Sequence, residues 1–354
     1  MKRAARVILA IIPGVASVLV AAAAPAQQAP AAGPPRKVVV GSLMYSMWGP
    51  YPGLAKRLEA LSSFVDGMNK TAWQKYHAGL DIAALPETAV TGEIRGSAKE
   101  TAVPLEGAVL DAFAAAARRN KCYVVVPLYL AEDAAKTKLY NACVLLDRGG
   151  KVCGIYRKVH PVDSGKADQL EGGVLPGKGF PVFACDFGKV GMQICYDGYF
   201  DDGWEALAHK GAELVIWSTQ SPQILGAQCP AHRHHYYVVT STWRNNISLV
   251  DPTGAVISQQ TKQPGLLVEQ IDLSYVLVNW QPQLRNGAAL AERYGKAVGY
   301  RYSEAEDGGI FWSNDPRRPV MEMIRGLGLE LPAGSLERNR RLQDRLRGGP
   351  PGME

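Results

Sequence analysis

The sequence predicts an α/β layered domain, and three observations lead to this prediction. Helix-like and strand-like segments alternate in the first third of the chain, whereas hairpin patterns dominate its middle and end. The composition, with 47% apolar and 20% charged residues, is that of an ordinary globular protein. This combination is typical of mixed sheets with helices on their outer faces, and 354 residues suffice for one large domain of that kind.

Strands and helices alternate up to residue 128. The expected order is a strand at 37–43, a helix over 54–69 with apolar residues at helical spacing, a strand at 81–85, an alanine-rich helix at 106–120 and a strand at 122–128. Two further strands, 139–146 and 151–156, flank Asp147-Arg148-Gly149-Gly150, which is a favourable hairpin turn. The first half of the domain should therefore contribute both sheet and covering helices.

Hairpins follow from residue 182 onward. Strands are expected at 182–186 and 189–195 around Gly188, then a helix at 204–209, then strands at 213–217, 236–242, 247–250, 255–258 and 266–271. Beyond Leu273 the pattern weakens, and 338–347 predicts a polar helical tail that is solvated or contacts a second subunit. We therefore place the main domain at 37–275 and a C-terminal extension at 276–354.

The first 26 residues predict an export signal. Lys2, Arg3 and Arg6 precede an apolar run at 7–20, and Ala24-Pro25-Ala26 offers a small-residue cleavage site. A retained membrane anchor is the alternative, but this run is short and proline-interrupted against the ~20 residues a span needs. Residues 27–36 predict a disordered linker. We expect a periplasmic or secreted protein without stable membrane insertion after processing.

The net charge and the cysteine content narrow the class of protein further. Removing the three basic residues of the signal lowers the formal net charge from +6 to +3, too weak to indicate a nucleic-acid partner. The chain has 6 cysteines, which an exported protein could pair, although the sequence does not say which. A domain of this size does not need disulfides for its stability.

Three reactive side chains stand at the ends of apolar runs. Glu87 closes Ala84-Leu85-Pro86-Glu87, Lys158 lies in Tyr156-Arg157-Lys158-Val159-His160, and Cys195 ends 191–195. An α/β sheet delivers groups into a cleft at such strand ends. Taken singly, each could be a solvated acid, a surface lysine or an inert buried thiol.

Together the three residues match what thiol attack on an amide requires. The carboxylate of Glu87 can take the thiol proton and return it to the leaving nitrogen. The ammonium of Lys158 can stabilise the oxyanion, and losing one such donor costs about 3–4 kcal/mol. The predicted nucleophile is the sulfur of Cys195.

From about residue 37 to 273 the chain resembles the nitrilase, or carbon–nitrogen hydrolase, superfamily. The likeness rests on 79–87, on Asn141-Ala142-Cys143 with 156–160, on 188–197, and on 211–214 and 251–254. It implies a four-layer α-β-β-α sandwich, a Glu87–Lys158–Cys195 triad, Glu171 as a second glutamate that orients Lys158 or positions water, and the backbone N–H of Tyr196 as an oxyanion donor. It also implies a homo-oligomer and neither metal nor organic cofactor.

The resemblance leaves the substrate open. Tyr196-Asp197 after the cysteine is more similar to amidases than to nitrilases, so a small-molecule amide ranks first, an N-carbamoyl amine second and a nitrile third. Gly198 to Asp202 and Pro161 depart from the family's usual residues on loops that line the pocket.

Two alternatives belong to other classes. One is a non-catalytic binding protein on the same fold. The other is a metal-binding protein using His232-Arg233-His234-His235, although His234 and His235 would point to opposite faces of a strand and no further metal-binding motif accompanies them.

Overall fold

Two six-stranded sheets form the centre of the protein in the computed structural model, which describes residues 33–92 and 97–351. The order of the first sheet is β14 (Gly265–Asp272), β1 (Lys37–Met44), β2 (Ile82–Ala84), β3 (Tyr123–Ala131), β4 (Leu139–Leu146), β5 (Val152–Arg157). The order of the second is β13 (Val256–Gln260), β12 (Ile247–Val250), β11 (Tyr237–Ser241), β10 (Leu214–Ser218), β9 (Gly188–Ile194), β8 (Val182–Cys185).

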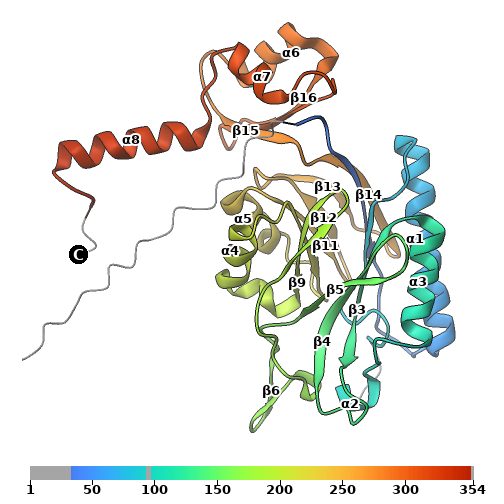
Figure 1. The fold of residues 1–354 in the computed structure, drawn as a ribbon. Coiled ribbons are helices and arrows are strands. Elements are labelled where there is room, and N and C mark those ends of the chain that lie inside the picture. Colours follow the sequence, from blue (N-terminus) through green and yellow to red (C-terminus); the bar gives the residue numbers. More distant parts are fainter. Residues whose placement is uncertain (1–32, 93–96, 352–354) are drawn as a thin grey trace, which may run out of the picture.

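The two sheets pack face to face, and helices cover their outer surfaces (Figure 1). Val125 of the first sheet and Ile216 of the second belong to one buried apolar cluster between the sheets. Helices α1 (Leu54–Tyr76) and α3 (Ala108–Asn120) cover the first sheet, and α4 (Asp201–His209) and α5 (Ile224–His234) cover the second. The four-layer α-β-β-α sandwich is confirmed.

Parallel pairing brings several strand ends to one edge of the sandwich. In the second sheet, Ile194, Ser218 and Ser241 are neighbours in register at the carboxyl ends of β9, β10 and β11. In the first sheet, β1 and β2 also run parallel. A bridge between Met44 and Thr242 joins the two sheets at this edge. Residues that follow β2 and β9 are therefore close in space although far apart in sequence.

Short elements complete the edge. They are α2 (Ala98–Thr101), β6 (Asp163–Lys166), β7 (Gln169–Leu170) and two 3₁₀ turns, η1 (Glu171–Gly173) and η2 (Cys195–Tyr199). Strands β6 and β7 pair with each other as a small ribbon outside the main sheets.

The chain after Leu273 is more regular than its sequence pattern indicates. Strands β15 (Tyr275–Asn279), β17 (Gly308–Ser313) and β16 (Val298–Ser303) form an antiparallel sheet, next to α6 (Ala288–Tyr294) and α7 (Val320–Gly326). Their apolar side chains form a small core of their own, which includes Leu290, Phe311 and Ile324. Helix α8 (Pro332–Arg347) projects from this unit and has no buried residue (Figure 1). The predicted polar tail forms most of α8.

The structure corrects the expectation of a strand around His234 and His235. His234 is the last residue of α5, and His235 adopts a left-handed conformation that ends the helix. Gly226 and Pro230, both poor helix formers, concealed the helix in the sequence. Over 33–92 and 97–351 there is no cluster of at least three His, Cys, Asp or Glu residues suited to a metal ion.

The predicted export signal at 1–26 lies outside the described residues, as does the linker up to residue 32. Arg36, at the end of that linker, is bound to the domain, since its backbone N–H donates to Asp272 Oδ1 at 3.0 Å. Within the part of the chain that is described, no helix combines the length and the apolar character of a membrane span. All six cysteines have free thiols.

Candidate active site

Glu87, Lys158 and Cys195 each follow a strand directly or closely. Glu87 comes after β2, Lys158 after β5, and Cys195 after β9 as the first residue of η2. The structure brings Glu87, Lys158 and Glu171 into hydrogen-bond contact, and the charges of Glu87 and Lys158 both act on the thiol of Cys195. The four predicted side chains therefore belong to one site.

Glu87 is held by one carboxylate oxygen. Its Oε1 accepts hydrogen bonds from Lys158 Nζ at 3.1 Å and from Asn141 Nδ2 at 2.9 Å. Its backbone carbonyl accepts from Trp243 Nε1 at 2.8 Å, which fixes the chain at this point. Oε2 is buried and accepts no hydrogen bond from any described residue. A buried carboxylate oxygen without a donor is uncommon and marks an acceptor available for another proton.

Lys158 is the cation of the site. Its Nζ donates to both oxygens of Glu171 at 2.9 Å as well as to Glu87. Burial by itself lowers the pKa of Lys158, but the negative charges of Glu87 and Glu171 outweigh burial and hold that pKa above its ordinary value. The ammonium therefore stays charged at neutral pH.

Glu171 and Asn141 complete the shell around the ammonium. Glu171 opens η1, and its Oε2 also accepts the backbone N–H of Val162 at 3.1 Å. Asn141 lies on β4, and its single amide nitrogen donates to Glu171 Oε1 at 2.8 Å and to Glu87. The two amide hydrogens are thus donated to two different carboxylates, and these hydrogen bonds offset the repulsion between the two negative charges.

Cys195 is the first residue of the tight turn that follows β9. Its φ is +43, in the left-handed region that non-glycine residues rarely adopt. Trp217 Nε1 donates to its carbonyl oxygen at 3.1 Å and holds the turn. Tyr196 follows as the second residue of η2, where a helical turn leaves amide N–H groups without partners inside the turn.

The thiol of Cys195 is protonated at rest. Burial and, to a smaller extent, the charge of Glu87 raise its pKa to about 12, against the opposite effects of Lys158 and of hydrogen bonds with Thr219 and the backbone of Gln220. A neutral thiol is a weak nucleophile, so this site needs a base that removes the proton as the sulfur attacks. The unpartnered oxygen of Glu87 is the available base.

Sequence reasoning gave no role to three residues that border the site. Asn141, Trp243 and Tyr129 contact or face the glutamates, and Tyr129 pairs with Asn141 across β3 and β4. Burial raises the pKa of the Tyr129 phenol, and so do the charges of Glu171 and Glu87. Asn141 was named only as part of Asn141-Ala142-Cys143, and the signal for its role was its place as a strongly polar residue inside the apolar strand LYNACVLL.

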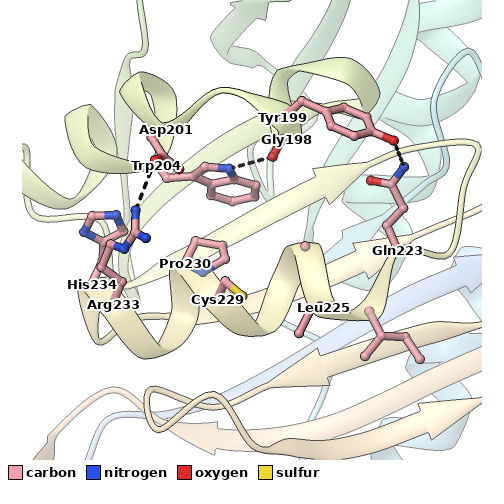
Figure 2. A pocket seen from close by; sticks show the side chains of 12 residues that line it. Gly198, Tyr199, Asp201, Trp204, Gln223, Leu225, Cys229, Pro230, Arg233 and His234 are labelled. Atoms are coloured by element: carbon pink, nitrogen blue, oxygen red, sulfur yellow. Dashed lines mark hydrogen bonds and ion pairs between the residues drawn. The ribbon is translucent and has the colours of Figure 1, made fainter.

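A hollow of about 480 Å³ lies beyond the nucleophile turn, between α4 and α5, and contains none of the predicted catalytic side chains (Figure 2). Tyr199 and Gln223 close one end with a hydrogen bond, and Arg233 pairs with Asp201 at the other. His234 and Cys229 line it, so the His232–His235 segment borders a surface hollow.

Comparison with known sequences gives one family. The carbon–nitrogen hydrolase family matches residues 42–277. The omega-amidase NIT2 of Danio rerio is 28% identical over 223 residues, which are 56% of this chain and 78% of that enzyme. The N-carbamoylputrescine amidase of Arabidopsis thaliana is 35% identical over 113 residues, 31% of this chain and 37% of that enzyme.

Comparison with solved structures gives the same fold. The amidase of Nesterenkonia AN1, from the nitrilase superfamily, superposes with a TM-score of 0.55 at 18% identity and covers 66% of this chain and 90% of its own. A glutamate-to-glutamine mutant of the amidase from Nesterenkonia sp. AN1, with a TM-score of 0.54 at 17% identity over 65% of this chain and 92% of that chain, shows the result of Michael addition of acrylamide at the active-site cysteine.

Proposed function

Because the chain belongs to the carbon–nitrogen hydrolase family, we propose that it cleaves a small amide through a thioester on Cys195. One observation carries this proposal: Glu87 has one oxygen held by Lys158 and Asn141 and a second, buried oxygen with no donor among the described residues. That arrangement supplies an oriented base next to a thiol whose proton is retained at neutral pH.

The first half of the reaction forms the thioester. The Cys195 sulfur attacks the amide carbonyl carbon while Glu87 accepts the thiol proton. The oxygen that becomes negative is stabilised by Lys158 Nζ and by the backbone N–H of Tyr196. Collapse of the tetrahedral intermediate breaks the carbon–nitrogen bond, and the proton held by Glu87 leaves with the ammonia or amine.

The second half returns the enzyme to its starting state. A water molecule attacks the thioester carbonyl as Glu87 takes one of its protons. The same two donors stabilise the second oxyanion. The sulfur then leaves the carbon and takes the proton back from Glu87, and a carboxylic acid is released. Glu171 and Asn141 keep Lys158 and Glu87 in position throughout.

An amide is the preferred substrate class, and the similarity to an omega-amidase supports it. An N-carbamoyl amine is the second candidate, which the similarity to N-carbamoylputrescine amidase favours. The two differ in their products, since a carbamoyl group yields carbon dioxide together with ammonia and an amine. A nitrile ranks third.

Ammonia release from a panel of amides, N-carbamoyl amines and nitriles tests the proposal. The Cys195→Ala variant should be inactive on the best substrate, whereas Cys229→Ala, which removes an exposed thiol outside the site, should keep the wild-type rate. Full turnover by the Cys195→Ala protein would refute the mechanism. Carbon dioxide formed in proportion to ammonia would assign the carbamoyl class.

We also propose that residues 1–26 direct export and are then removed, and that the mature protein forms a homo-oligomer. A mature chain beginning at Gln27 in the extracytoplasmic fraction is the expected result. Cytoplasmic protein that retains Met1 would contradict export. Light scattering of the purified protein tests the oligomer, and a monomeric mass at micromolar concentration would exclude it.

A further inference from the structure

The carboxylate of Asp197 joins the segment of Lys158 to the turn of Cys195. Asp197 is fully buried, and its Oδ2 accepts hydrogen bonds from Tyr156 Oη at 2.7 Å and from the backbone N–H of Ile194 at 3.0 Å. Its Oδ1 accepts the backbone N–H of His160 at 2.8 Å. Tyr156 and His160 stand two residues before and two residues after Lys158. One carboxylate thus holds both sides of the lysine and the strand residue that precedes the nucleophile.

The imidazole of His160 extends this connection outward. Its Nδ1 lies 3.3 Å from Asp197 Oδ1, and its Nε2 lies 3.3 Å from Oδ2 of Asp202 on α4. The first contact has the distance of an ion pair without the geometry of a hydrogen bond. The ring stacks on Phe200, with centroids 3.9 Å apart and an interplanar angle of 11°. The ring centroid of Phe180 lies 5.9 Å from that of His160.

We propose that Asp197 and His160 are positioning residues, which together set the separation between the Lys158 ammonium and the Cys195 sulfur. This inference rests on the proposed function, because it assigns a purpose to a network around that site. Neither residue is required to touch substrate. An error of 1 Å in the placement of catalytic groups can reduce turnover about 100-fold without abolishing binding, and that is the effect expected here.

The contacts of His160 make the arrangement sensitive to pH. The interaction with Asp197 raises the pKa of His160, burial opposes this, and Asp202 raises it again. Asp197 and Asp202 are the acids that face the ring, and Tyr156 binds the far oxygen of Asp197. Since the folded-state pKa is raised, the doubly paired imidazolium is complete at low pH and loses one partner as the pH rises through that pKa.

Kinetics of four variants on the best substrate test the inference. Asp197→Asn should lower kcat about 100-fold and leave KM within about threefold. His160→Gln should lower kcat about tenfold and abolish the alkaline decline that we expect in the wild type. Asp202→Asn should move that decline to lower pH. His209→Gln is the matched control, because His209 pairs with Glu205 on α4 at the same 3.3 Å away from the site, and its profile should equal that of the wild type.

A measurement independent of activity completes the test. In the Cys195→Ala protein, NMR titration of the imidazole should give a His160 pKa above the ordinary value, and Asp202→Asn should lower it. If Asp197→Asn fails to fold, Tyr156→Phe, which removes one donor to the same carboxylate, should reduce kcat in the same direction. Wild-type kcat and pH profile in His160→Gln and Tyr156→Phe would overturn the inference, even if Cys195→Ala is inactive. A fully active Cys195→Ala protein would instead refute the proposed function.

Discussion

Lys158 Nζ lies 3.1 Å from Glu87 Oε1, and 1% and 2% of these two side chains are exposed. Removing two charges from water is costly, and the cost is offset only when each charge keeps its partners. Here the ammonium has a second carboxylate in Glu171 and the Glu87 carboxylate has a second donor in Asn141. These partners offset the cost of burying the two charges, and they leave Glu87 Oε2 without a donor among the described residues.

Replacing Lys158 with Met should therefore destabilise the fold as well as stop turnover. The variant leaves the buried Glu87 and the half-buried Glu171 without a cation, and breaking a buried pair in this way costs about 3–5 kcal/mol of unfolding free energy. Denaturant unfolding measures the change. Lys138→Met, which removes an exposed lysine, should stay within about 0.5 kcal/mol of the wild type. Equal stability of the two variants would show that the buried pair contributes little.

Asn141→Asp should be the most pH-dependent of the site variants. It places a third carboxylate beside Glu87 and Glu171, where like charges raise its pKa. An acid with a raised folded-state pKa destabilises the protein once it ionises, so unfolding free energy should fall as the pH rises through that pKa and recover in acid. Asn314→Asp, an exposed change of the same kind, should show no such slope between pH 5 and 8. Parallel curves for both variants would count against the proposed arrangement.

The rate of Cys195 alkylation should show whether Glu87 removes the thiol proton during attack or whether the thiol reacts only after it has ionised by itself. At pH 7 a thiol with a pKa of about 12 is ionised to about one part in 10⁵. We expect Glu87→Gln to slow the reaction with iodoacetamide at pH 7, because the proton acceptor is lost. Above pH 10 the same variant should react faster, because removal of the Glu87 charge lowers the pKa of the thiol.

The experiment uses a background in which the exposed thiols of Cys153 and Cys229 are replaced by serine. Labelling of Cys195 is then followed by mass spectrometry. A Glu87→Gln protein that reacts faster at every pH would show that the thiol needs no base and would contradict the assigned role of Glu87.

Gly198→Ala should disturb the turn at Cys195 by displacing Trp217, which holds that turn. A Cβ on Gly198 would lie 2.3 Å from Cζ2 of Trp217, whose indole is fully buried and donates to the Cys195 carbonyl. We expect a loss of about 1–3 kcal/mol in stability and a clear fall in kcat. Gly179→Ala is the control, since its Cβ would meet no heavy atom within 4 Å. Unchanged kcat in Gly198→Ala would show that the turn tolerates displacement of Trp217.

The α/β layered class could be predicted from the sequence because it depends on local patterns, whereas the four-layer sandwich was implied by the resemblance to the carbon–nitrogen hydrolase family. Apolar runs of strand length and one amphipathic helix after another determine the layers. The reactive residues stand at the ends of those runs, and the carboxyl ends of parallel strands lie at the same edge of a sheet. Glu87, Lys158 and Cys195 could thus be named from the residues and from the resemblance before any contact was known.

Other features depended on contacts between distant segments. Helix α5 carries Gly226 and Pro230, and packing of Ala227 and Ala231 against the second sheet compensates for its low intrinsic propensity. The small sheet after Leu273 closes around its own core, although no single strand in it has a strong pattern. Local propensity is a weak guide where tertiary burial supplies most of the stability.

The sequence alone determined which side chains could perform chemistry here, because a thiol, an ammonium and carboxylates are properties of residue types. Only the tertiary structure decided their state. It left Glu87 Oε2 without a donor among the described residues, and burial raised the pKa of the Cys195 thiol so that it keeps its proton. It also brought two segments together at the carboxylate of Asp197, which binds His160 of one segment and Ile194 of the other, 34 residues further along the chain. Burial and partner geometry set protonation and position, and neither is encoded in any one segment.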